Sequence, residues 1–213
     1  MIFSDSKEIN RQLLALASAK IQNSLSNRQN PLVIALDGGS GAGKSTFAVL
    51  ISAEFDTALI PLDDFYSANI PDEDWEQFTV TEKLKNVFDW KRLRNDVLEP
   101  LIKGETAGWY AFDFGSKLPD GTYQMQTELN ERQSAKVILI DGAYSSSQEI
   151  SDLVDLTILL SVPIEERHKR LNNREKDKDF LEKWHRMWDE VEAYYFTQVK
   201  PENSFDLVVK FDS

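Results

Sequence analysis

The chain of 213 residues is long enough for one ordinary domain with a substantial core, and its 28% charged and 41% hydrophobic residues argue against collagen-like, coiled-coil and wholly disordered classes. The 36 acidic and 24 basic residues give a formal net charge of −12. Such a chain repels polyanions, which argues against binding to nucleic acid or to an anionic membrane but leaves room for a local basic pocket that holds one small phosphate ligand.

The absence of cysteine excludes disulfides, thiolate catalysis and cysteine-ligated zinc. No apolar run approaches the roughly 20 residues of a membrane span, and Met1–Asp5 lacks the cationic start of a secretory signal. We therefore expect a cytoplasmic protein without nucleic-acid or membrane partners. The composition leaves open whether it forms a homo-oligomer.

Helical patterns recur along the chain. A leading helix is expected within residues 1–30, because apolar side chains follow helical spacing from Ile9 to Leu25. The polar stretch around Pro71–Asp74 is expected to be a solvated loop. Three further helical segments are expected at Ala48–Ile51, Trp90–Lys103 and Ile164–Gln198.

Five short apolar runs have the composition of strands that are buried on both faces, and they alternate with the helical segments. Such alternation predicts a mostly parallel sheet with helices on both faces, which is an α/β fold. The runs are Leu32–Leu36, Ala58–Leu62, Val137–Ile140, Leu156–Val162 and Leu207–Val209.

Residues 105–135 break this alternation. A run of aromatic residues there is followed by Pro119-Asp120-Gly121 and then by Tyr123 and Met125, which predicts a β-hairpin excursion. No internal repeat, low-complexity tract or linker marks a second domain. Residues 1–213 are therefore expected to form a single domain.

Gly38–Ser45 matches the phosphate-binding loop pattern G-x-x-x-x-G-K-[ST] at every fixed position. Glycines let successive backbone N–H groups face one anion, the following helix directs its positive end to the same point, Lys44 reaches the β- and γ-phosphates, and the Ser45 hydroxyl binds Mg²⁺. A buried strand before the loop and a helix after it supply the context that this mechanism needs. The predicted nucleotide-binding residues are Gly38, Gly39, Ser40, Gly41, Ala42, Gly43, Lys44, Ser45 and Thr46.

A phosphate-binding loop is shared by kinases, switches, motors and transport ATPases. The Asn-Lys-x-Asp and Asp-x-x-Gly patterns of GTPase switches are absent, which disfavours that class. Asp113-Phe114-Gly115 matches the metal-binding motif of protein kinases, but no His-Arg-Asp loop accompanies it. We interpret that match as coincidence.

Two acidic positions follow predicted strands, where the carboxyl ends of parallel strands flank a ligand crevice. Asp63 is the candidate base that accepts the proton of an attacking substrate hydroxyl, with Asp64 as the adjacent alternative. Asp141 has the position of an acid that holds Mg²⁺ together with Ser45. Each acid can instead serve a turn or a helix cap.

A basic stretch places Arg167, Arg170 and Arg174 at i, i+3 and i+7, so that their guanidinium groups share one helix face. Such a face can clamp a transferring phosphoryl group. The alternative is a solvated face whose arginines pair with nearby glutamates. We favour the functional interpretation because the phosphate-binding loop is present.

The aromatic stripe between Phe180 and Tyr195 is assigned to core packing, because apolar residues at helical spacing usually face a core. His168 and His185 lack a convincing metal-ligand spacing. The expected metal is therefore Mg²⁺ that enters with the nucleotide.

Taken in chain order, the phosphate-binding loop, Asp63-Asp64-Phe65-Tyr66, Val137–Gly142, Arg167–Arg174 and Phe205–Val209 resemble the uridine kinase family, which is grouped with pantothenate kinase and phosphoribulokinase. The resemblance implies a three-layer α/β/α P-loop NTPase fold with a central, mostly parallel five-stranded sheet. It also implies ATP or GTP as phosphoryl donor, Mg²⁺, and a small-molecule acceptor.

The same resemblance implies roles for single residues. Asp63 corresponds to the base, and Lys44 holds the donor phosphates. Arg170 and Arg174 belong to a helical lid, expected within residues 164–180, that closes over the phosphates. The residues implied for acceptor binding are Tyr66, Phe112, Arg167, and Asp74 or Asp89, one of which would hold the ribose hydroxyls.

Two positions depart from the family pattern. Asp141 stands where glutamate is usual, and Phe112-Asp113-Phe114 lacks the tyrosine hydroxyl and the following histidine and arginine that help to recognise the base. The expected function is ATP-dependent phosphoryl transfer to a hydroxyl of a nucleoside such as uridine or cytidine. The alternatives are a kinase for another small metabolite or a nucleoside monophosphate, a P-loop switch without an acceptor, and a noncatalytic binding module.

Overall fold

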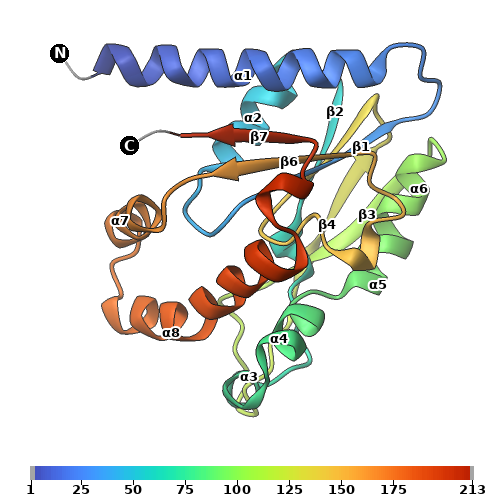
Figure 1. Cartoon of the computed structure of the whole chain (residues 1–213). Coiled ribbons are helices and arrows are strands. Elements are labelled where there is room, and N and C mark those ends of the chain that lie inside the picture. Colours follow the sequence, from blue (N-terminus) through green and yellow to red (C-terminus); the bar gives the residue numbers. More distant parts are fainter. Residues whose placement is uncertain (1–2, 212–213) are drawn as a thin grey trace.

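The computed structural model describes the backbone of residues 3–211 and the side chains from residue 11 to residue 211. Five parallel strands form a central sheet in the order β2-β5-β1-β6-β7 (Figure 1). All five predicted strands are confirmed, and β1 and β5 are buried along their whole length. The strands are β1 (Leu32–Asp37), β2 (Thr57–Pro61), β5 (Val137–Asp141), β6 (Leu156–Ser161) and β7 (Leu207–Lys210).

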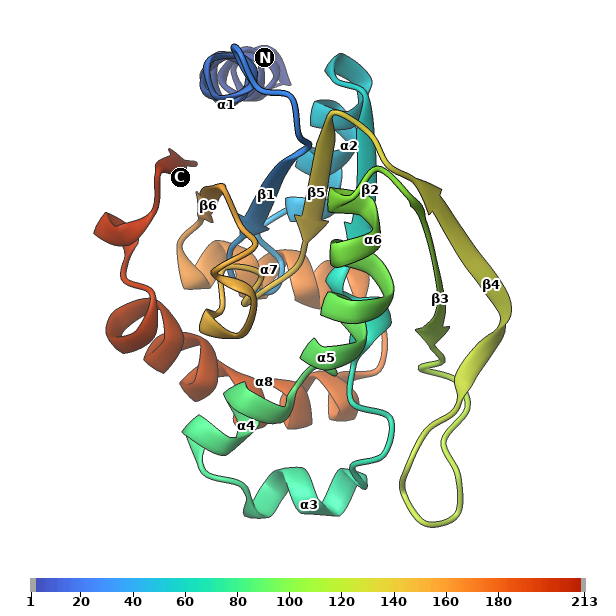
Figure 2. The ribbon, with the colours of Figure 1, turned by 90° about the vertical axis from the view of Figure 1, so that its right-hand side faces the viewer.

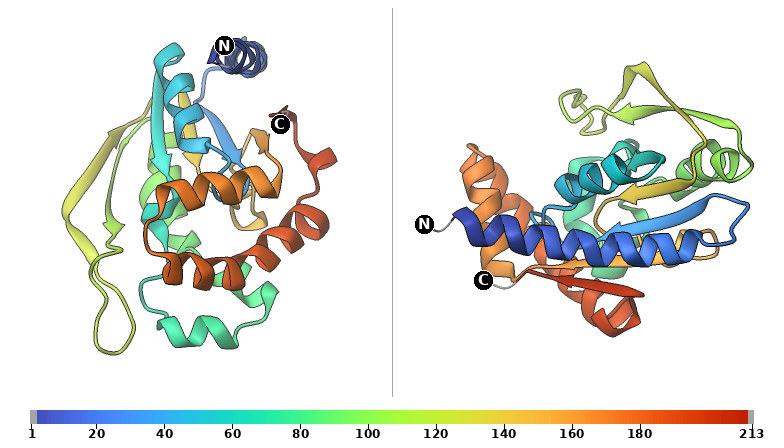
Figure 3. Two further views of the ribbon diagram at one scale, coloured as in Figure 1. Left: turned by 90° about the vertical axis from the view of Figure 1, so that its left-hand side faces the viewer. Right: turned by 90° about the horizontal axis from the view of Figure 1, so that it is seen from above.

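Two apolar cores cover the two faces of this sheet, because successive side chains of each strand point to opposite faces. Along β1, Leu32, Ile34 and Leu36 join the core beneath α1 (Phe3–Leu25) and α2 (Lys44–Glu54). Val33 joins the core on the opposite face, to which helical segments between residues 72 and 102 and between residues 178 and 199 contribute apolar side chains (Figure 3). The three-layer α/β/α prediction is thus confirmed.

The predicted hairpin forms beside the β2 edge. Its antiparallel strands are β3 (Thr106–Phe112) and β4 (Met125–Gln133), and Figure 2 shows it standing apart from the central sheet. The indole Nε1 of Trp109 donates a hydrogen bond to Asp64 at 2.8 Å, and the Arg132 guanidinium lies over the Trp109 ring. These contacts fix β3 against the chain that follows β2.

The expected loop near residue 71 is wrong, because the chain there forms two short helices, α3 (Asp72–Gln77) and α4 (Val80–Asn86). Pro71 stands at the N-cap of α3, and three acidic residues occupy the first turn of that helix, where the helix dipole favours negative charge. Thr79 and Glu82 form a reciprocal capping box at the start of α4. The polar residues that suggested a loop are the first-turn and capping residues of these two helices.

The helix expected over Ile164–Gln198 is interrupted. It consists of α7 (Ile164–Arg174) and α8 (Lys178–Tyr194), followed by a π-helical turn at Tyr195–Val199. Asp177 caps the N-terminus of α8 by accepting a hydrogen bond from Phe180 N at 3.0 Å, so the second helix begins directly after it. The remaining helical segments are α5 (Trp90–Arg92), a π-helical turn (Leu93–Leu98), α6 (Glu99–Ile102), and 3₁₀ turns at Leu62–Phe65, Gln148–Ile150 and Glu202–Ser204.

Within residues 3–211, every helix is too short or too polar to cross a bilayer.

The carboxylate of Asp37, at the end of β1, is fully buried and joins three segments of the chain. It accepts hydrogen bonds from the backbone N–H groups of Gly38 at 2.8 Å, Tyr144 at 2.9 Å and Ser146 at 3.0 Å. It also accepts one from the Tyr195 hydroxyl at 2.9 Å. Burial raises the pKa of Asp37, and the backbone donors oppose this change. One side chain thereby holds the start of the glycine-rich loop, the loop after β5 and the turn after α8 together.

We expect Asp37→Asn to lower the free energy of unfolding by about 2–4 kcal/mol, because an amide NH₂ would face N–H donors and leave at least one of them unpaired. Tyr195→Phe removes a single hydrogen bond and should cost about 1 kcal/mol. Urea denaturation of both variants measures the difference. Equal losses for the two variants would contradict this role of the carboxylate.

Candidate active site

The glycine-rich loop connects β1 to α2, and its backbone adopts conformations that favour glycine. Gly41 and Gly43 have φ angles of 81° and 92°, in the left-handed region. A Cβ atom on Gly41 would lie 2.7 Å from the backbone oxygen of Arg167. The loop therefore wraps closely against α7 and leads directly into the N-terminus of α2, where backbone N–H groups and the helix dipole favour an anion.

A buried ion pair holds the loop from behind. Glu192 of α8 accepts a hydrogen bond from Ser40 N at 2.7 Å, and Arg167 of α7 donates one to Ser40 O at 2.9 Å. The Arg167 guanidinium and the Glu192 carboxylate meet at 2.7 Å, with side chains only 10% and 5% exposed. Arg167 was expected to contact the acceptor, but this pairing keeps it out of the cavity described next.

A cavity of about 400 Å³ opens on the other side of the loop, where the carboxyl ends of β1, β2 and β5 meet. It brings together residues that are far apart in the sequence and of opposite charge. The predicted site residues that line it are Ser40, Gly41, Gly43, Lys44, Ser45, Thr46, Asp63, Tyr66, Asp141 and Arg174.

Lys44 supplies positive charge at the cavity wall. Its Nζ atom donates to the backbone oxygens of Gly38 at 2.9 Å and Gly39 at 3.2 Å, so that the ammonium group lies over the loop. The same charge lowers the pKa of both Asp63 and Asp141. Lys44 therefore faces both carboxylates as well as the loop.

The two neighbouring acids Asp63 and Asp64 point in different directions from the 3₁₀ turn after β2. Asp63 lines the cavity, whereas Asp64 accepts the hydrogen bond from Trp109 on the hairpin. Desolvation raises the pKa of Asp63, and the nearby carboxylate of Asp141 raises it further, against the lowering effect of Lys44. Of the two acids, only Asp63 faces the cavity.

Asp141 and Ser45 fit a divalent cation of the hard, oxygen-seeking kind. Asp141 is 8% exposed, and its Oδ1 atom is buried without a hydrogen-bond partner among the described residues. Desolvation raises the pKa of this carboxyl, and the Ser45 hydroxyl and the Lys44 charge lower it. An orphaned carboxylate oxygen beside a hydroxyl provides ligand atoms of the type that Mg²⁺ prefers.

The lid arginines lie at different depths along α7. Arg174 lines the cavity from the exposed last turn, and its charge lowers the pKa of Asp63. Arg170 donates to Glu166 at 3.1 Å and to the loop oxygen of Ala42 at 3.3 Å. The arginine face predicted from the sequence thus divides into a buried loop support at Arg167, a loop contact at Arg170 and a cavity residue at Arg174.

The phosphoribulokinase / uridine kinase family model matches residues 33–179, which include the glycine-rich loop, both cavity carboxylates and the lid arginines. The chain belongs to the phosphoribulokinase / uridine kinase family. It is accordingly a kinase with a P-loop nucleotide site and an ATP-type phosphoryl donor.

Curated relatives and solved structures agree with this assignment. A uridine kinase of Chlamydia pneumoniae is 28% identical over 182 residues, which cover 80% of this chain and 73% of that protein. Uridine-cytidine kinase A of Dictyostelium discoideum is 29% identical over 191 residues. These residues cover 86% of this chain and 34% of that protein. The structure of a possible uridine kinase from Bacillus stearothermophilus has a TM-score of 0.65, with 18% identity over 95% of this chain and 98% of that one.

Four residues expected to bind the acceptor lie outside the cavity lining of this kinase. Besides Arg167, Asp89 caps α5 by accepting a hydrogen bond from Arg92 N at 3.0 Å, and Asp74 belongs to the first turn of α3. Phe112 is buried and packs 5.7 Å from the Tyr66 ring. Phe112 therefore supports a wall of the cavity from behind.

Other cavity residues were missed or misassigned from the sequence. Phe114 belongs to the Asp-Phe-Gly match, and Phe180 and Trp184 belong to the stripe assigned to packing, yet all three line the cavity. Trp188 of the same stripe is buried as expected, and Leu181 is buried but also lines the cavity. Trp184 both packs on the core and borders the cavity, a dual position that helical periodicity alone does not reveal.

We expect Arg167→Gln and Arg174→Gln to differ sharply in stability, although both residues lie on α7. Loss of Arg167 leaves the Glu192 carboxylate buried without its cation, which should lower the free energy of unfolding by about 3–5 kcal/mol. Loss of the exposed Arg174 should change it by less than about 0.5 kcal/mol. Chemical denaturation tests this, and equal effects would contradict the buried pairing.

Proposed function

We propose that this kinase transfers the γ-phosphoryl group of ATP to a hydroxyl of a nucleoside such as uridine or cytidine, with Mg²⁺ as the metal. The observation that carries this proposal is the single cavity in which Lys44, Arg174, Asp63 and Asp141 converge in front of the glycine-rich loop. The family and the uridine kinase relatives support it.

The donor side is formed by the glycine-rich loop. Backbone N–H groups at the start of α2 and the Lys44 ammonium bind the β- and γ-phosphates. Ser45 and Asp141 would hold Mg²⁺, which neutralises phosphate charge when bound. GTP carries the same phosphates and is an alternative donor, because these groups contact the phosphates and not the base.

Asp63 is the proposed general base. Its carboxylate accepts the proton of the acceptor hydroxyl, while the hydroxyl oxygen forms a bond to the γ-phosphorus and the bond from that phosphorus to the β–γ bridging oxygen breaks, which releases ADP. Arg174 faces the same space and stabilises negative charge on the transferring group. Arg170 holds α7 against the loop through Ala42.

The acceptor side is the aromatic part of the cavity. Tyr66, Phe114, Phe180 and Trp184 line it, and the Tyr66 and Phe114 rings meet edge-on at 5.5 Å. Aromatic faces of this kind favour a planar ring such as a nucleobase. Burial raises the pKa of Tyr66 well above its ordinary value, so its hydroxyl stays neutral and can donate a hydrogen bond to the acceptor.

We expect Asp63→Asn to lower kcat by about 10²–10⁴-fold, because an amide accepts no proton from the acceptor hydroxyl, while ATP affinity changes little. The matched control is Asp64→Asn, the neighbouring acid that faces Trp109. Steady-state kinetics and nucleotide titration measure the two effects. Near-normal turnover of Asp63→Asn would remove Asp63 from the role of base.

Acceptor identity is tested by a screen of nucleosides, nucleoside monophosphates, pantothenate and sugar derivatives for acceptor-dependent ADP release, with mass analysis of the product. We expect uridine or cytidine to stimulate ADP release and to gain one phosphoryl group. Stimulation by another metabolite alone would change the acceptor class. ATP hydrolysis that no acceptor stimulates would favour a switch, and nucleotide binding without turnover would favour a binding module.

A further inference from the structure

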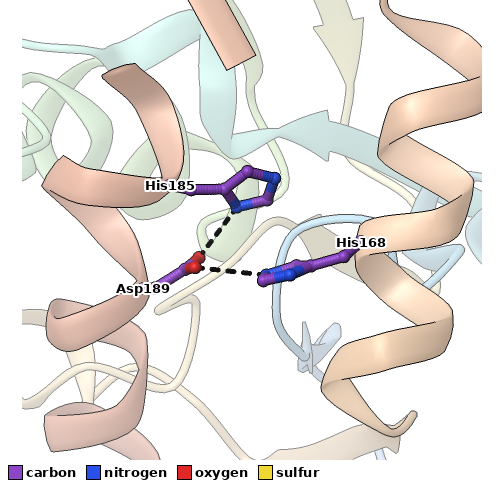
Figure 4. A group of neighbouring side chains, drawn as sticks. All are labelled: His168, His185 and Asp189. Atoms are coloured by element: carbon purple, nitrogen blue, oxygen red, sulfur yellow. Dashed lines mark hydrogen bonds and ion pairs between the residues drawn. The ribbon is translucent and has the colours of Figure 1, made fainter. Parts of the chain in front are cut away.

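Both histidines of the chain meet one carboxylate in the space between α7 and α8. Figure 4 shows His168 from α7 and His185 and Asp189 from α8, with the three side chains directed toward one another. His185 Nδ1 lies 3.1 Å from Asp189 Oδ1, and His168 Nε2 lies 3.2 Å from Asp189 Oδ2. The two imidazole ring centroids are 3.9 Å apart.

Helical spacing explains half of this arrangement. His185 and Asp189 are separated by four residues on α8, which places two ligand-type side chains on one helix face. The break at residues 175–177 then lets α7 lie beside α8, so that His168 supplies a third side chain from a different helix. The distance between the histidines along the sequence concealed this cluster.

The distances suit a tetrahedral metal ion. Ligand bonds of about 2.0–2.1 Å to nitrogen and oxygen imply ligand–ligand separations of roughly 3.3 Å in a tetrahedral zinc site. The nitrogen–oxygen separations of 3.1 Å to Asp189 Oδ1 and 3.2 Å to Asp189 Oδ2 involve different carboxylate oxygens, and both are close to this value. One ligand atom from each residue lies within 4.8 Å of the others.

Hydrogen bonding leaves this cluster incomplete. His185 Nδ1 forms a hydrogen bond with Asp189 Oδ1 at 3.1 Å, but the Nε2 atoms of His168 and His185 are both buried without a hydrogen-bond partner in the described part of the chain. His168 Nε2 approaches the carboxylate without the alignment that a hydrogen bond needs, and the neighbouring Arg167 is engaged with Glu192. A cluster whose role is only to pack would be expected to satisfy these ring nitrogens.

We propose that His168, His185 and Asp189 bind one divalent transition-metal ion of the zinc type, with a water molecule as fourth ligand, and that the ion ties α7 to α8. Two imidazoles and one carboxylate form a ligand set that suits zinc and similar ions, whereas Mg²⁺ prefers oxygen atoms alone. This site is separate from the Ser45 and Asp141 pair, because none of its three residues lines the cavity.

A bound ion at this position would fix the two helices that border the cavity. α7 carries Arg170 and Arg174, and α8 carries Phe180 and Trp184. An ion that bridges the helices therefore limits how far α7, with its arginines, can move relative to α8, with its aromatic side chains. The inference concerns binding of the ion and does not depend on the identity of the acceptor.

The test uses the full chain without an affinity tag, so that these two histidines are the sole imidazoles and no thiolate is present. Co²⁺ is titrated in the presence of excess Mg²⁺, which occupies the oxygen site, and the visible absorption of cobalt reports tetrahedral coordination. We expect one Co²⁺ per chain, which Zn²⁺ displaces. Zn²⁺ should also raise the melting temperature, since it binds the folded state.

Three variants, His168→Gln, His185→Gln and Asp189→Asn, should each weaken binding by more than the roughly 10- to 100-fold that loss of an outer-shell partner costs. Glu190→Gln is the matched control, because it removes an exposed carboxylate one residue along the same helix. Binding that survives both histidine substitutions, or no binding in the presence of Mg²⁺, would overturn the proposal.

A measurement on the unaltered chain guards against variants that fail to fold. Nuclear magnetic resonance of the imidazole groups gives two sets of signals, one for each histidine. One equivalent of Zn²⁺ should shift both sets together, with no further change beyond that ratio. A shift of one set alone, or no shift, would likewise overturn the proposal.

Discussion

The buried carboxylate of Asp37 is the constraint on which the geometry of the site depends. Strand β1 ends at this residue, and the glycine-rich loop, the loop after β5 and the turn after α8 all donate hydrogen bonds to it. Burial of a carboxylate is costly unless its oxygens are paired. The folded state is therefore stable only when all three segments lie within hydrogen-bonding distance of Asp37. The phosphate-binding loop is thus held from its first residue by the core.

A second buried group completes this support. Glu192 and Arg167 bind the N–H and carbonyl groups of Ser40, so that α7 and α8 are attached to the loop that they face. The loop is then positioned before any phosphate arrives, which is the condition under which electrostatic stabilisation is most effective. The chain is acidic overall, but these contacts direct Lys44 and the α2 N-terminus into one cavity.

Much of the fold and part of the site were predictable because their signals are local. The glycine-rich loop, the five strands of the central sheet and the positions of Asp63 and Asp141 at strand ends follow from patterns of fewer than ten residues. The short α3 and α4 were missed because helix caps and acidic first turns have the same composition as loops. The different orientations of Asp63 and Asp64 were not predictable, because they depend on the hydrogen bond from Trp109 of the hairpin to Asp64.

Other features depend on contacts between distant residues. Asp37 meets Tyr195 across 158 positions, and Arg167 meets Ser40 across 127, so no spacing rule reveals either pair. One signal was present for Asp37, because a lone acid ends an apolar strand immediately before the glycine-rich loop. The histidine cluster required knowledge of the break between α7 and α8, which a continuous helical pattern concealed.

Residue-resolved hydrogen exchange of the nucleotide-free protein tests most directly whether Asp37 organises the site in advance. We expect the amides of Gly38, Tyr144 and Ser146, which donate to this carboxylate, to exchange as slowly as amides within β1 and β5, although all three lie outside the strands. Exchange of these amides as fast as that of the hairpin turn around Gly121 would contradict a loop held in place before nucleotide binds.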